Sequence, residues 1–288
     1  MQYHVNGRLV PEGEATVRVD DRGFRYGDAA FETLRAYGGT VFEWAAHRDR
    51  LVGTCETLGM GGAVPADLRD RIRATLDAND LADAYVRVSV TRGVQAGKLT
   101  PDPEVEPSVV VIVKPLPRGG VEGDPVWDGP AAVRTVERRR IPESAMPADA
   151  KTHNYLDGIL ARLELRGSGA DEALVRDTDG FVAEGATSNV FFVDDGVLKT
   201  PALSGPILPG VTRAVVLELA TAADVPVETD AYGVDTVREA DEAFLTNTTW
   251  EVRPVAAVDG VAVGGGPVTD RLAAAFDRRV EMRHYRRE

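Results

Sequence analysis

The stretch AKTHNYLDGILARLELRGSGADEALV, residues 150–175, places a lysine just before two segments with clear structural patterns. Apolar residues recur after the lysine at intervals of three and four, which predicts a helix through Leu156, Ile159, Leu160 and Leu163. DEALVRD then follows a glycine-containing turn and predicts a strand. Lys151 is one of only four lysines in a chain of 288 residues with 33 basic residues. Its retention suggests a chemical role that arginine cannot fill.

The segments before residue 115 combine strands with helices and predict an α+β first half. YHVNGRLV alternates around the turn signal Asn6-Gly7, which predicts a β-hairpin. Further strands are predicted at residues 40–42, 85–93 and 108–113, and helices over residues 44–58 and from Pro65.

The run KPLPRGGVEGDP, residues 114–125, has too many prolines and glycines for the interior of a helix or strand. We therefore predict a small N-terminal domain over residues 1–114, an interdomain linker over residues 115–125 and a larger C-terminal domain over residues 126–288. In the second domain, the patterns predict strands at 131–136, 171–177, 188–194 and 242–245, and helices after Lys151, from Pro209 and from about Val268.

The composition limits the classes of function. With 46 acidic and 33 basic residues, the formal net charge is −13, and such a field repels nucleic acid and anionic membranes. No apolar run approaches the ~20 residues of a membrane span and no signal peptide is recognised, so a soluble protein is expected. The single cysteine, Cys55, fits a reducing cytoplasm and is expected to be a small buried hydrophobe.

The distribution of charged residues leads to two further predictions. The cations are almost all arginine and the anions are many, which predicts a halophilic protein that stays soluble in concentrated salt. A GC-rich genome would also replace lysine by arginine, so both explanations stay open. The C-terminal arginines are expected to form the solvated last turns of a helix: Arg278, Arg279, Arg283, Arg286 and Arg287.

Several common catalytic motifs are missing from the sequence. It has no GxGxxG, GxxxxGK[ST], GxSxG or HExxH pattern. Its four histidines are scattered, at His4, His47, His153 and His284, so no metal site is predicted.

Three features remain, namely Lys151, the helix start LPGVTR at residues 208–213, and Glu184 in VAEGATSNVFF. A lysine amine bonds covalently to an aldehyde, backbone N–H groups at a helix start bind phosphate, and a carboxylate keeps a pyridine nitrogen protonated. These are the three requirements of pyridoxal 5'-phosphate (PLP). Each feature alone has an ordinary structural explanation, as a surface lysine or a helix cap.

A series of segments strengthens this hypothesis because they resemble one family in its own order. They are DRGFRYGDAAFETLR (21–35), AHRDRL (46–51), KTHNYL (151–156), ADEALVRDTDGFVAEGATSNVFFV (170–193), LPGVTR (208–213) and TNTTWEVRPV (246–255). Together they resemble the class IV aminotransferases, which include branched-chain and D-amino-acid aminotransferases, (R)-amine transaminases and 4-amino-4-deoxychorismate lyases. The resemblance covers nearly the whole chain.

The resemblance implies an α+β protein of PLP fold type IV, like the D-amino-acid aminotransferases. In that fold a small N-terminal α/β domain precedes a larger C-terminal mixed β-barrel-like domain with helices. It also implies a homodimer whose site lies at the domain interface, is completed by the partner subunit and is covered by the loop at residues 115–125.

The resemblance also implies roles for individual residues. Lys151 is the internal-aldimine lysine that also moves the proton between the substrate Cα and the cofactor C4′. Glu184 pairs with the pyridine nitrogen, so that the ring accepts electrons from the carbanion. Tyr155 leans toward the phenolate oxygen of the cofactor, although a core tyrosine is an alternative at this position.

The same resemblance assigns a phosphate-binding set. Arg50 clamps the phosphate, with a helix-surface arginine paired with Asp49 or Glu56 as the alternative. The set is completed by the backbone amides of Val211 and Thr212, the Thr212 hydroxyl and Thr248.

The resemblance also implies a set of substrate contacts from three places in the chain, namely Phe31, Thr33, Arg35, Tyr85, Arg87, Thr248 and Thr249. These places resemble different branches of the family. Thr33 in FETLR and the Thr246-Asn247 pair are similar to the lyases. The short Lys151 to Asn154-Tyr155 spacing is shared by D-amino-acid aminotransferases and lyases. The Tyr85-x-Arg87 pattern instead resembles branched-chain aminotransferases, where this arginine assists carboxylate recognition; a salt-bridged strand arginine is the alternative.

We predict a PLP-dependent transaminase that moves an amino group between an amino acid and a 2-oxo acid by a ping-pong aldimine/ketimine mechanism. The alternative is a 4-amino-4-deoxychorismate lyase that eliminates pyruvate and gives 4-aminobenzoate. A non-catalytic binding protein that kept the fold and lost the cofactor is the third hypothesis.

Overall fold

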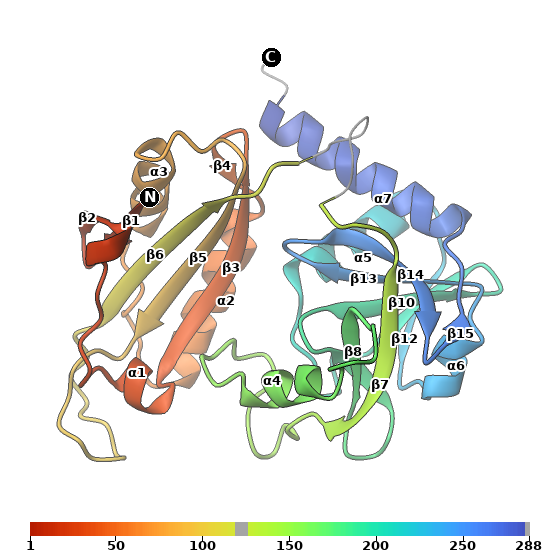
Figure 1. Ribbon diagram of the computed structural model, residues 1–288, viewed down its shortest axis with the longest axis horizontal. Coiled ribbons are helices and arrows are strands. Elements are labelled where there is room, and N and C mark those ends of the chain that lie inside the picture. Colours follow the sequence, from red (N-terminus) through yellow and green to blue (C-terminus); the bar gives the residue numbers. More distant parts are fainter. Residues whose placement is uncertain (119–125, 286–288) are drawn as a thin grey trace. The chain divides into compact units, whose positions relative to one another are not determined.

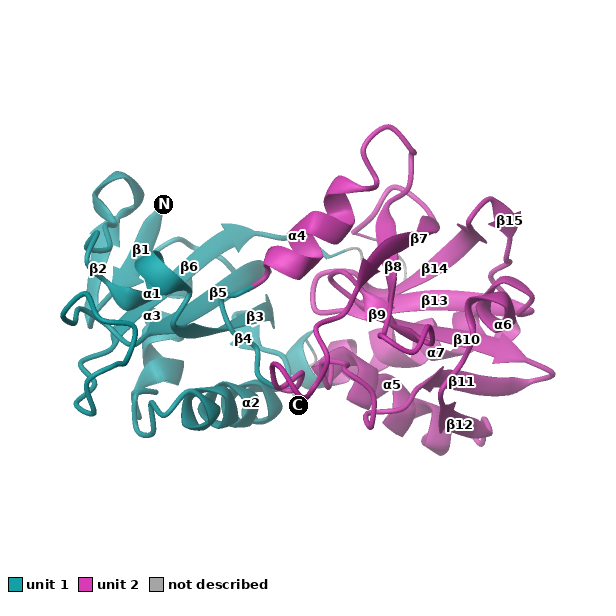
Figure 2. Cartoon of the chain, turned by 90° about the horizontal axis from the view of Figure 1, so that it is seen from below, with its two compact units in different colours: residues 1–118, 150–154, 283–288 teal, residues 119–149, 155–282 magenta. Residues whose placement is uncertain are grey.

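The computed structural model describes residues 1–118 and 126–285, and they divide into two units (Figure 2). Unit 1 takes residues 1–118, 150–154 and 283–285, and unit 2 takes residues 126–149 and 155–282. The predicted linker lies outside the described residues from residue 119 onward, as do Arg286 and Arg287. The domain boundaries given above stay predictions.

Unit 1 contains six strands, three α-helices and a short 3-10 helix among its described residues. They are β1 (Gln2–Val5), β2 (Arg8–Pro11), η1 (Glu12–Glu14), α1 (Arg22–Tyr26), β3 (Ala29–Tyr37), β4 (Thr40–Val41), α2 (Trp44–Thr57), α3 (Leu68–Asp77), β5 (Ala84–Thr91) and β6 (Ser108–Pro115).

The strands of unit 1 form one antiparallel sheet in the order β2-β1-β6-β5-β3-β4 (Figure 1). The predicted hairpin is confirmed, because β1 and β2 join at Asn6 and Gly7, which both adopt positive φ. In β5 every second side chain is fully buried, as in Val86 and Val88. These side chains share a core with apolar residues of α2 and α3 such as Leu51 and Ile72.

Unit 2 contains nine strands and four α-helices among its described residues. They are β7 (Ala131–Arg139), α4 (Leu156–Leu163), β8 (Glu172–Arg176), β9 (Val182–Gly185), β10 (Asn189–Asp194), β11 (Val197–Pro201), α5 (Val211–Ala222), β12 (Val227–Asp230), α6 (Val234–Arg238), β13 (Glu242–Asn247), β14 (Glu251–Val258), β15 (Val261–Ala262) and α7 (Pro267–Val280). A π-helical turn, η2 (Glu281–Tyr285), follows α7.

The sheet of unit 2 is mixed and strongly curled. Its order is β12-β11-β10-β13-β14-β7-β8-β9, with β15 on β14, and the β11–β12, β14–β7 and β7–β8 pairs are parallel. The terminal strand β9 lies against β10 and β11 from the other half of the sheet, so the sheet curls toward a barrel. Figure 1 shows α5 and α7 beside this sheet. The predicted fold class, α+β with a barrel-like second half, is confirmed.

Two strands that position the site were not predicted. In β3 nearly every side chain is buried, so no polar face alternates with an apolar one. All four residues of β9 are also buried. Period-two patterns fail for strands that are covered on both faces. The helix expected from Pro65 begins three residues later, at Leu68.

The expectation of solvated arginines at the C-terminus is wrong for Arg279. Arg278 is exposed in the last turn of α7, but the Arg279 side chain is only 14% exposed and pairs with Glu218 of α5 at 2.7 Å. Arg283, after the helix, pairs with Glu43 in unit 1. None of the helices in the described residues combines the length and apolar composition needed to span a bilayer.

Candidate functional site

The predicted site residues fall in both units. Unit 1 holds Phe31, Thr33, Arg35, Arg50, Tyr85, Arg87 and Lys151. Unit 2 holds Tyr155, Glu184, Val211, Thr212, Thr248 and Thr249.

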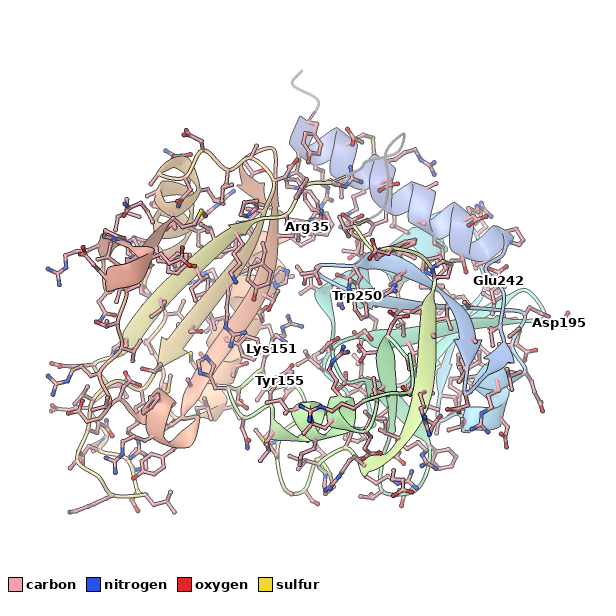
Figure 3. All side chains as sticks on the ribbon, in the orientation of Figure 1. Arg35, Lys151, Tyr155, Asp195, Glu242 and Trp250 are labelled. Atoms are coloured by element: carbon pink, nitrogen blue, oxygen red, sulfur yellow. The ribbon has the colours of Figure 1, made fainter. Side chains whose placement is uncertain are left out.

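Lys151 is fixed by its backbone against the edge of β3. The Phe31 N–H donates to the Lys151 carbonyl at 3.0 Å, and the His153 N–H donates to the Ala29 carbonyl at 2.9 Å. Residues 151–153 therefore extend the sheet of unit 1 by a short antiparallel bridge. Figure 3 shows Lys151 beside this sheet. Its Nζ atom lies 4.5 Å from the centre of the Phe31 ring.

A residue that the sequence did not single out, Thr54 of α2, also holds Lys151. The Lys151 N–H donates to the buried Thr54 hydroxyl at 3.0 Å, and that hydroxyl donates to the Arg50 carbonyl at 2.9 Å. Both interactions use one oxygen, so the backbone of the lysine is tied to the helix that carries Arg50.

The five predicted substrate contacts of unit 1 share one face of the sheet. Alternation along β3 puts Phe31, Thr33 and Arg35 on the same side. Their register partners on β5 are Ser89, Arg87 and Tyr85, which point to the same face. The Arg87 guanidinium lies 3.9 Å from the Phe31 ring centre, so cations from Arg87 and Lys151 both contact this ring.

Arg35 is the most enclosed member of this set. It is fully buried, lies over the Tyr37 ring at 4.9 Å and donates to the Pro117 carbonyl at 3.2 Å. These contacts give it a structural function on the same face.

His153 joins this face, although no local pattern marks it beyond its position two residues after the lysine. Its Nε2 lies 3.0 Å from the Ser89 hydroxyl, and its ring meets the Phe31 ring edge-on at 5.6 Å. Burial, and then the charge of Arg87, lower the pKa of His153 to about 4. The histidine is therefore neutral near pH 7 and adds no third positive charge beside Arg87 and Lys151.

Arg50 points its guanidinium at a buried carboxylate. Its Nε and Nη2 donate to Glu32 Oε1 and Oε2 at 2.7 and 2.8 Å. The alternative pairing with Asp49 or Glu56 is therefore not the one found, and Asp49 pairs with Arg48 instead. His47 completes the cluster, with Nδ1 at 2.8 Å from Glu32 Oε2.

In unit 2, Glu184 of β9 is buried, and its partners include Leu208, Asn189 and Arg140. Its Oε2 accepts from the Leu208 N–H at 3.1 Å and from Asn189 Nδ2 at 3.4 Å, and its Oε1 lies 3.1 Å from Arg140 Nε. Arg140 and Asn189 were not predicted, since neither has a local pattern that marks it. These donors stabilise the ionised carboxylate in a single orientation.

The start of α5 lies next to this carboxylate. Gly210 is the N-cap residue, and no side chain caps the helix, so the first N–H groups at Val211 and Thr212 are available to an anion. A Cβ added at Gly210 would lie 2.0 Å from Asn189 Oδ1. Asn189 Nδ2 also donates to the Leu208 carbonyl at 3.0 Å. The glycine therefore permits the contact that links Glu184 to the helix start.

The turn that carries Thr248 and Thr249 is organised by Asn247. The Asn247 side-chain oxygen accepts from the Thr249 N–H, the Thr249 hydroxyl and the Trp250 N–H, at 3.0, 3.1 and 2.7 Å. The Asn247 amide donates to the Thr187 carbonyl at 3.3 Å, which ties this turn to the loop before β10. Tyr155 is half-buried at the N-cap of α4.

Taken separately, the two units hold groups whose chemistry suits different parts of a cofactor with an aldehyde, a phosphate and a basic ring nitrogen. Lys151 supplies the amine, Glu184 a buried anion, and the uncapped start of α5 a set of N–H groups. Arg50 supplies a fixed cation. The part of the chain that the structure describes contains no group of His, Cys, Asp and Glu that could hold a metal ion.

A cavity of about 870 Å³ in unit 2 lies elsewhere, among residues of β7, β8, α6 and β14 that include Arg134, Arg176 and Arg238. None of the predicted site residues, all of which the structure describes, lines it. Its volume alone therefore does not make it the candidate site.

Comparison with known proteins gives one consistent result. The family model described as Amino-transferase class IV matches residues 29–258. A Methanocaldococcus jannaschii protein provisionally named a branched-chain-amino-acid aminotransferase is 38% identical over 280 residues, covering 96% of this chain and 95% of its own. A D-alanine aminotransferase from Staphylococcus haemolyticus is 32% identical over 284 residues, covering 97% and 98%.

Solved structures agree with these relatives. A branched-chain aminotransferase from Thermoproteus uzoniensis with norvaline superimposes with a TM-score of 0.90 at 31% identity, covering 99% of this chain and 96% of that one. The branched-chain amino acid aminotransferase from Thermobaculum terrenum in its PLP form gives a TM-score of 0.87 at 29% identity, covering 98% and 94%.

Proposed function

The chain belongs to the class IV aminotransferase family, and from this premise we propose which of its residues carry out the reaction. The protein is an aminotransferase, which transfers an amino group from a donor to an acceptor. We propose PLP as its cofactor, and amino acids and 2-oxo acids as its substrates. The observation that carries the proposal is Lys151, whose backbone is bonded to both β3 and Thr54 and whose amine lies over Phe31.

When bound, PLP supplies an aldehyde for a covalent bond to an amine and a ring that withdraws electrons. We assign the amine to Lys151, whose Nζ atom would also accept the proton from the substrate carbon. Because its backbone is fixed at two points, the four-carbon side chain pivots about a constant origin. Arginine cannot replace it, since a guanidinium forms no such bond at neutral pH.

We assign Glu184 to the ring nitrogen. A carboxylate in this position keeps the nitrogen protonated, and so favours removal of the substrate proton. The hydrogen-bond and ion-pair partners of Glu184 hold its carboxylate in one orientation before the cofactor binds. Arg140 and Asn189 therefore join the site as residues that orient the carboxylate.

We assign the phosphate to Arg50, the amides of Val211 and Thr212, the Thr212 hydroxyl and Thr248, and the phenolate oxygen to Tyr155. The uncapped start of α5 supports the first assignment. We assign the substrate carboxylate to Arg87, and the shared face of β3 and β5, where Arg87 lies over Phe31, supports this assignment. Phe31, Thr33, Arg35, Tyr85 and Thr249 are proposed to shape the same substrate site.

The reaction is tested by mixing the purified protein, loaded with PLP, with one candidate donor at a time. Conversion of the cofactor to its pyridoxamine form by L-leucine or D-alanine is expected, because the named relatives are aminotransferases. The donor that reacts also gives the handedness. Release of pyruvate and 4-aminobenzoate from 4-amino-4-deoxychorismate, without that conversion, would instead establish the lyase reaction.

Lys151→Ala should abolish both conversion and the absorbance of the covalent bond to PLP. Lys114→Ala is the matched control, because Lys114 is an exposed lysine at the end of β6. A Lys151→Ala protein with normal turnover would refute the assignment. A protein that stays colourless with PLP would revive the hypothesis of a non-catalytic binding protein.

We also propose that the protein works as a homodimer in the cytoplasm, at elevated salt. The helix α4 exposes Leu156 and Ile159 at 59% and 55%, and Leu163 one turn later, which is an apolar stripe that a second copy would cover. The net charge of −13 supports the salt proposal. Sedimentation at two salt concentrations tests the dimer and its dependence on salt. A monomer at every concentration would refute the dimer.

A further inference from the structure

We propose that Glu32 is a positioning residue that aims Arg50 at the phosphate of the cofactor. The proposal rests on the function proposed above and assigns a role to a residue outside every set predicted from the sequence. Glu32 acts through Arg50 and touches neither substrate nor cofactor.

The first observation is the geometry of the pair. Two parallel bonds join the Arg50 guanidinium, through Nε and Nη2, to the two oxygens of Glu32. A planar guanidinium held along one edge cannot rotate about its last torsion without breaking both bonds. Its other edge, which includes Nη1, is thereby aimed in one direction.

The second observation is burial. Glu32 is 1% exposed, His47 2% and Arg50 12%. A carboxylate so enclosed stays ionised only when it is paired. Burial by itself raises the pKa of Glu32, but Arg50 first and His47 second outweigh it and lower the pKa to about 2. The anion is therefore permanent at any working pH.

The third observation is His47, which backs the same carboxylate. A carboxylate only accepts, so His47 Nδ1 donates to Glu32 Oε2 at 2.8 Å. Burial lowers the pKa of His47, and Arg50 and Lys151 lower it further against the opposing effect of Glu32. The neutral ring fixes Oε2 without competing with Arg50 for the negative charge.

The fourth observation is the placing of these residues on one helix. His47, Arg50 and Thr54 lie at intervals of three and four along α2, so they share a face. Thr54 holds the backbone of Lys151 from that face. One face of α2 therefore fixes both Lys151 and Arg50. In the proposed site these two residues bind the aldehyde and the phosphate of one rigid cofactor, so the spacing between them matters for binding.

The position of Glu32 on β3 separates its role from substrate binding. Side chains alternate along a strand, so Glu32 lies on the opposite face from Phe31 and Thr33 and meets α2. A change at Glu32 should therefore affect the affinity for PLP and leave the KM of the amino acid unchanged once the site is saturated with PLP.

Two physical effects oppose each other here, and their balance makes the proposal testable. The negative charge of Glu32 weakens the attraction of Arg50 for a phosphate, whereas its bonds hold Arg50 in place. If charge decided, Glu32→Gln would bind PLP more tightly. We expect weaker binding, by roughly tenfold, because an unrestrained arginine loses side-chain freedom when it binds.

The experiment titrates the full-length protein with PLP and, separately, with pyridoxal, which lacks the phosphate. Glu32→Gln should raise the Kd for PLP about tenfold and leave the Kd for pyridoxal unchanged. Glu56→Gln removes an exposed charge from the same helix and should change neither Kd. Glu32→Asp, which keeps the charge on a shorter side chain, should also weaken PLP binding.

Three outcomes would overturn the proposal. If Glu32→Gln or Glu32→Asp binds PLP as tightly as the wild type does, Glu32 does not position Arg50. An equal loss for PLP and pyridoxal shows a general structural defect. If the wild-type protein binds no PLP, the proposed function itself is refuted. The wild-type titration separates this outcome from the first two, which concern the variants.

Discussion

Gly210→Ala tests the contact that joins Glu184 to the start of α5. The new Cβ would lie 2.0 Å from Asn189 Oδ1 and 3.2 Å from its Cγ. The φ of Gly210 is −66°, which alanine adopts freely, so the cost is steric and comes from the crowded side chain. Asn189 must move, and its bonds to Glu184 and the Leu208 carbonyl lengthen or break.

The magnitude follows from two contributions. Forcing a methyl group into a packed site costs about 1–3 kcal/mol. Two weakened hydrogen bonds cost about 0.5–1.5 kcal/mol each. We therefore expect the free energy of unfolding to fall by roughly 2–6 kcal/mol, which is large for a single substitution.

The assay is urea unfolding followed by circular dichroism, with Gly53→Ala as the matched control. Gly53 lies inside α2, and a Cβ there meets no atom within 4 Å. Its replacement should stabilise the protein by about 0.5–1 kcal/mol, because alanine is the better helix former. A Gly210→Ala protein within about 0.5 kcal/mol of the wild type would refute the reasoning, since such a contact cannot be relieved without cost.

Three further predictions concern separate parts of the site. Glu184→Gln should keep covalent PLP binding but slow turnover strongly, as measured by single-turnover absorbance, and normal turnover would count against its role at the ring nitrogen. Thr54→Val should destabilise the protein by about 1–3 kcal/mol more than Thr75→Val, because both hydroxyls bond a carbonyl four residues back but only Thr54 also accepts from Lys151. His153 has its pKa lowered from 6.5 to about 4, so its contribution to stability is complete above pH 6.5 and is lost as the pH falls toward 4. The free energy of unfolding, measured at pH 7 and at pH 4.5, should therefore fall less in His153→Gln than in the wild type. The difference should be roughly 1–2 kcal/mol after allowing for the partial exposure of His153. An equal fall in both proteins would contradict the lowered pKa.

Local patterns accounted for much of the secondary structure. The hairpin at Asn6-Gly7, the helix over residues 44–58 and the helix after Lys151 all follow from spacing or turn chemistry. The strands β3 and β9 do not, because burial on both faces removes the alternation that marks a strand. These two strands carry Glu32 and Glu184.

The candidate site divides in the same way. Lys151, Glu184 and Arg50 have side chains whose chemistry points to PLP, and their motifs match a family in order along the chain. The residues that hold them, such as Thr54, Asn189 and Arg140, are ordinary polar residues in the sequence. Their bonds show only when the folded chain places them beside their partners.

The sequence by itself determined the family and most of the helices in the described residues, because these depend on residue type and on spacing over a few residues. It also gave the reactive groups that we propose. The tertiary structure alone decided that Thr54 bonds Lys151, 97 residues away, and that Glu32 is an ion buried against Arg50. The physical reason is that the free energy of a buried polar group depends on its partners, and those partners are chosen by the pairing of strands and the packing of helices.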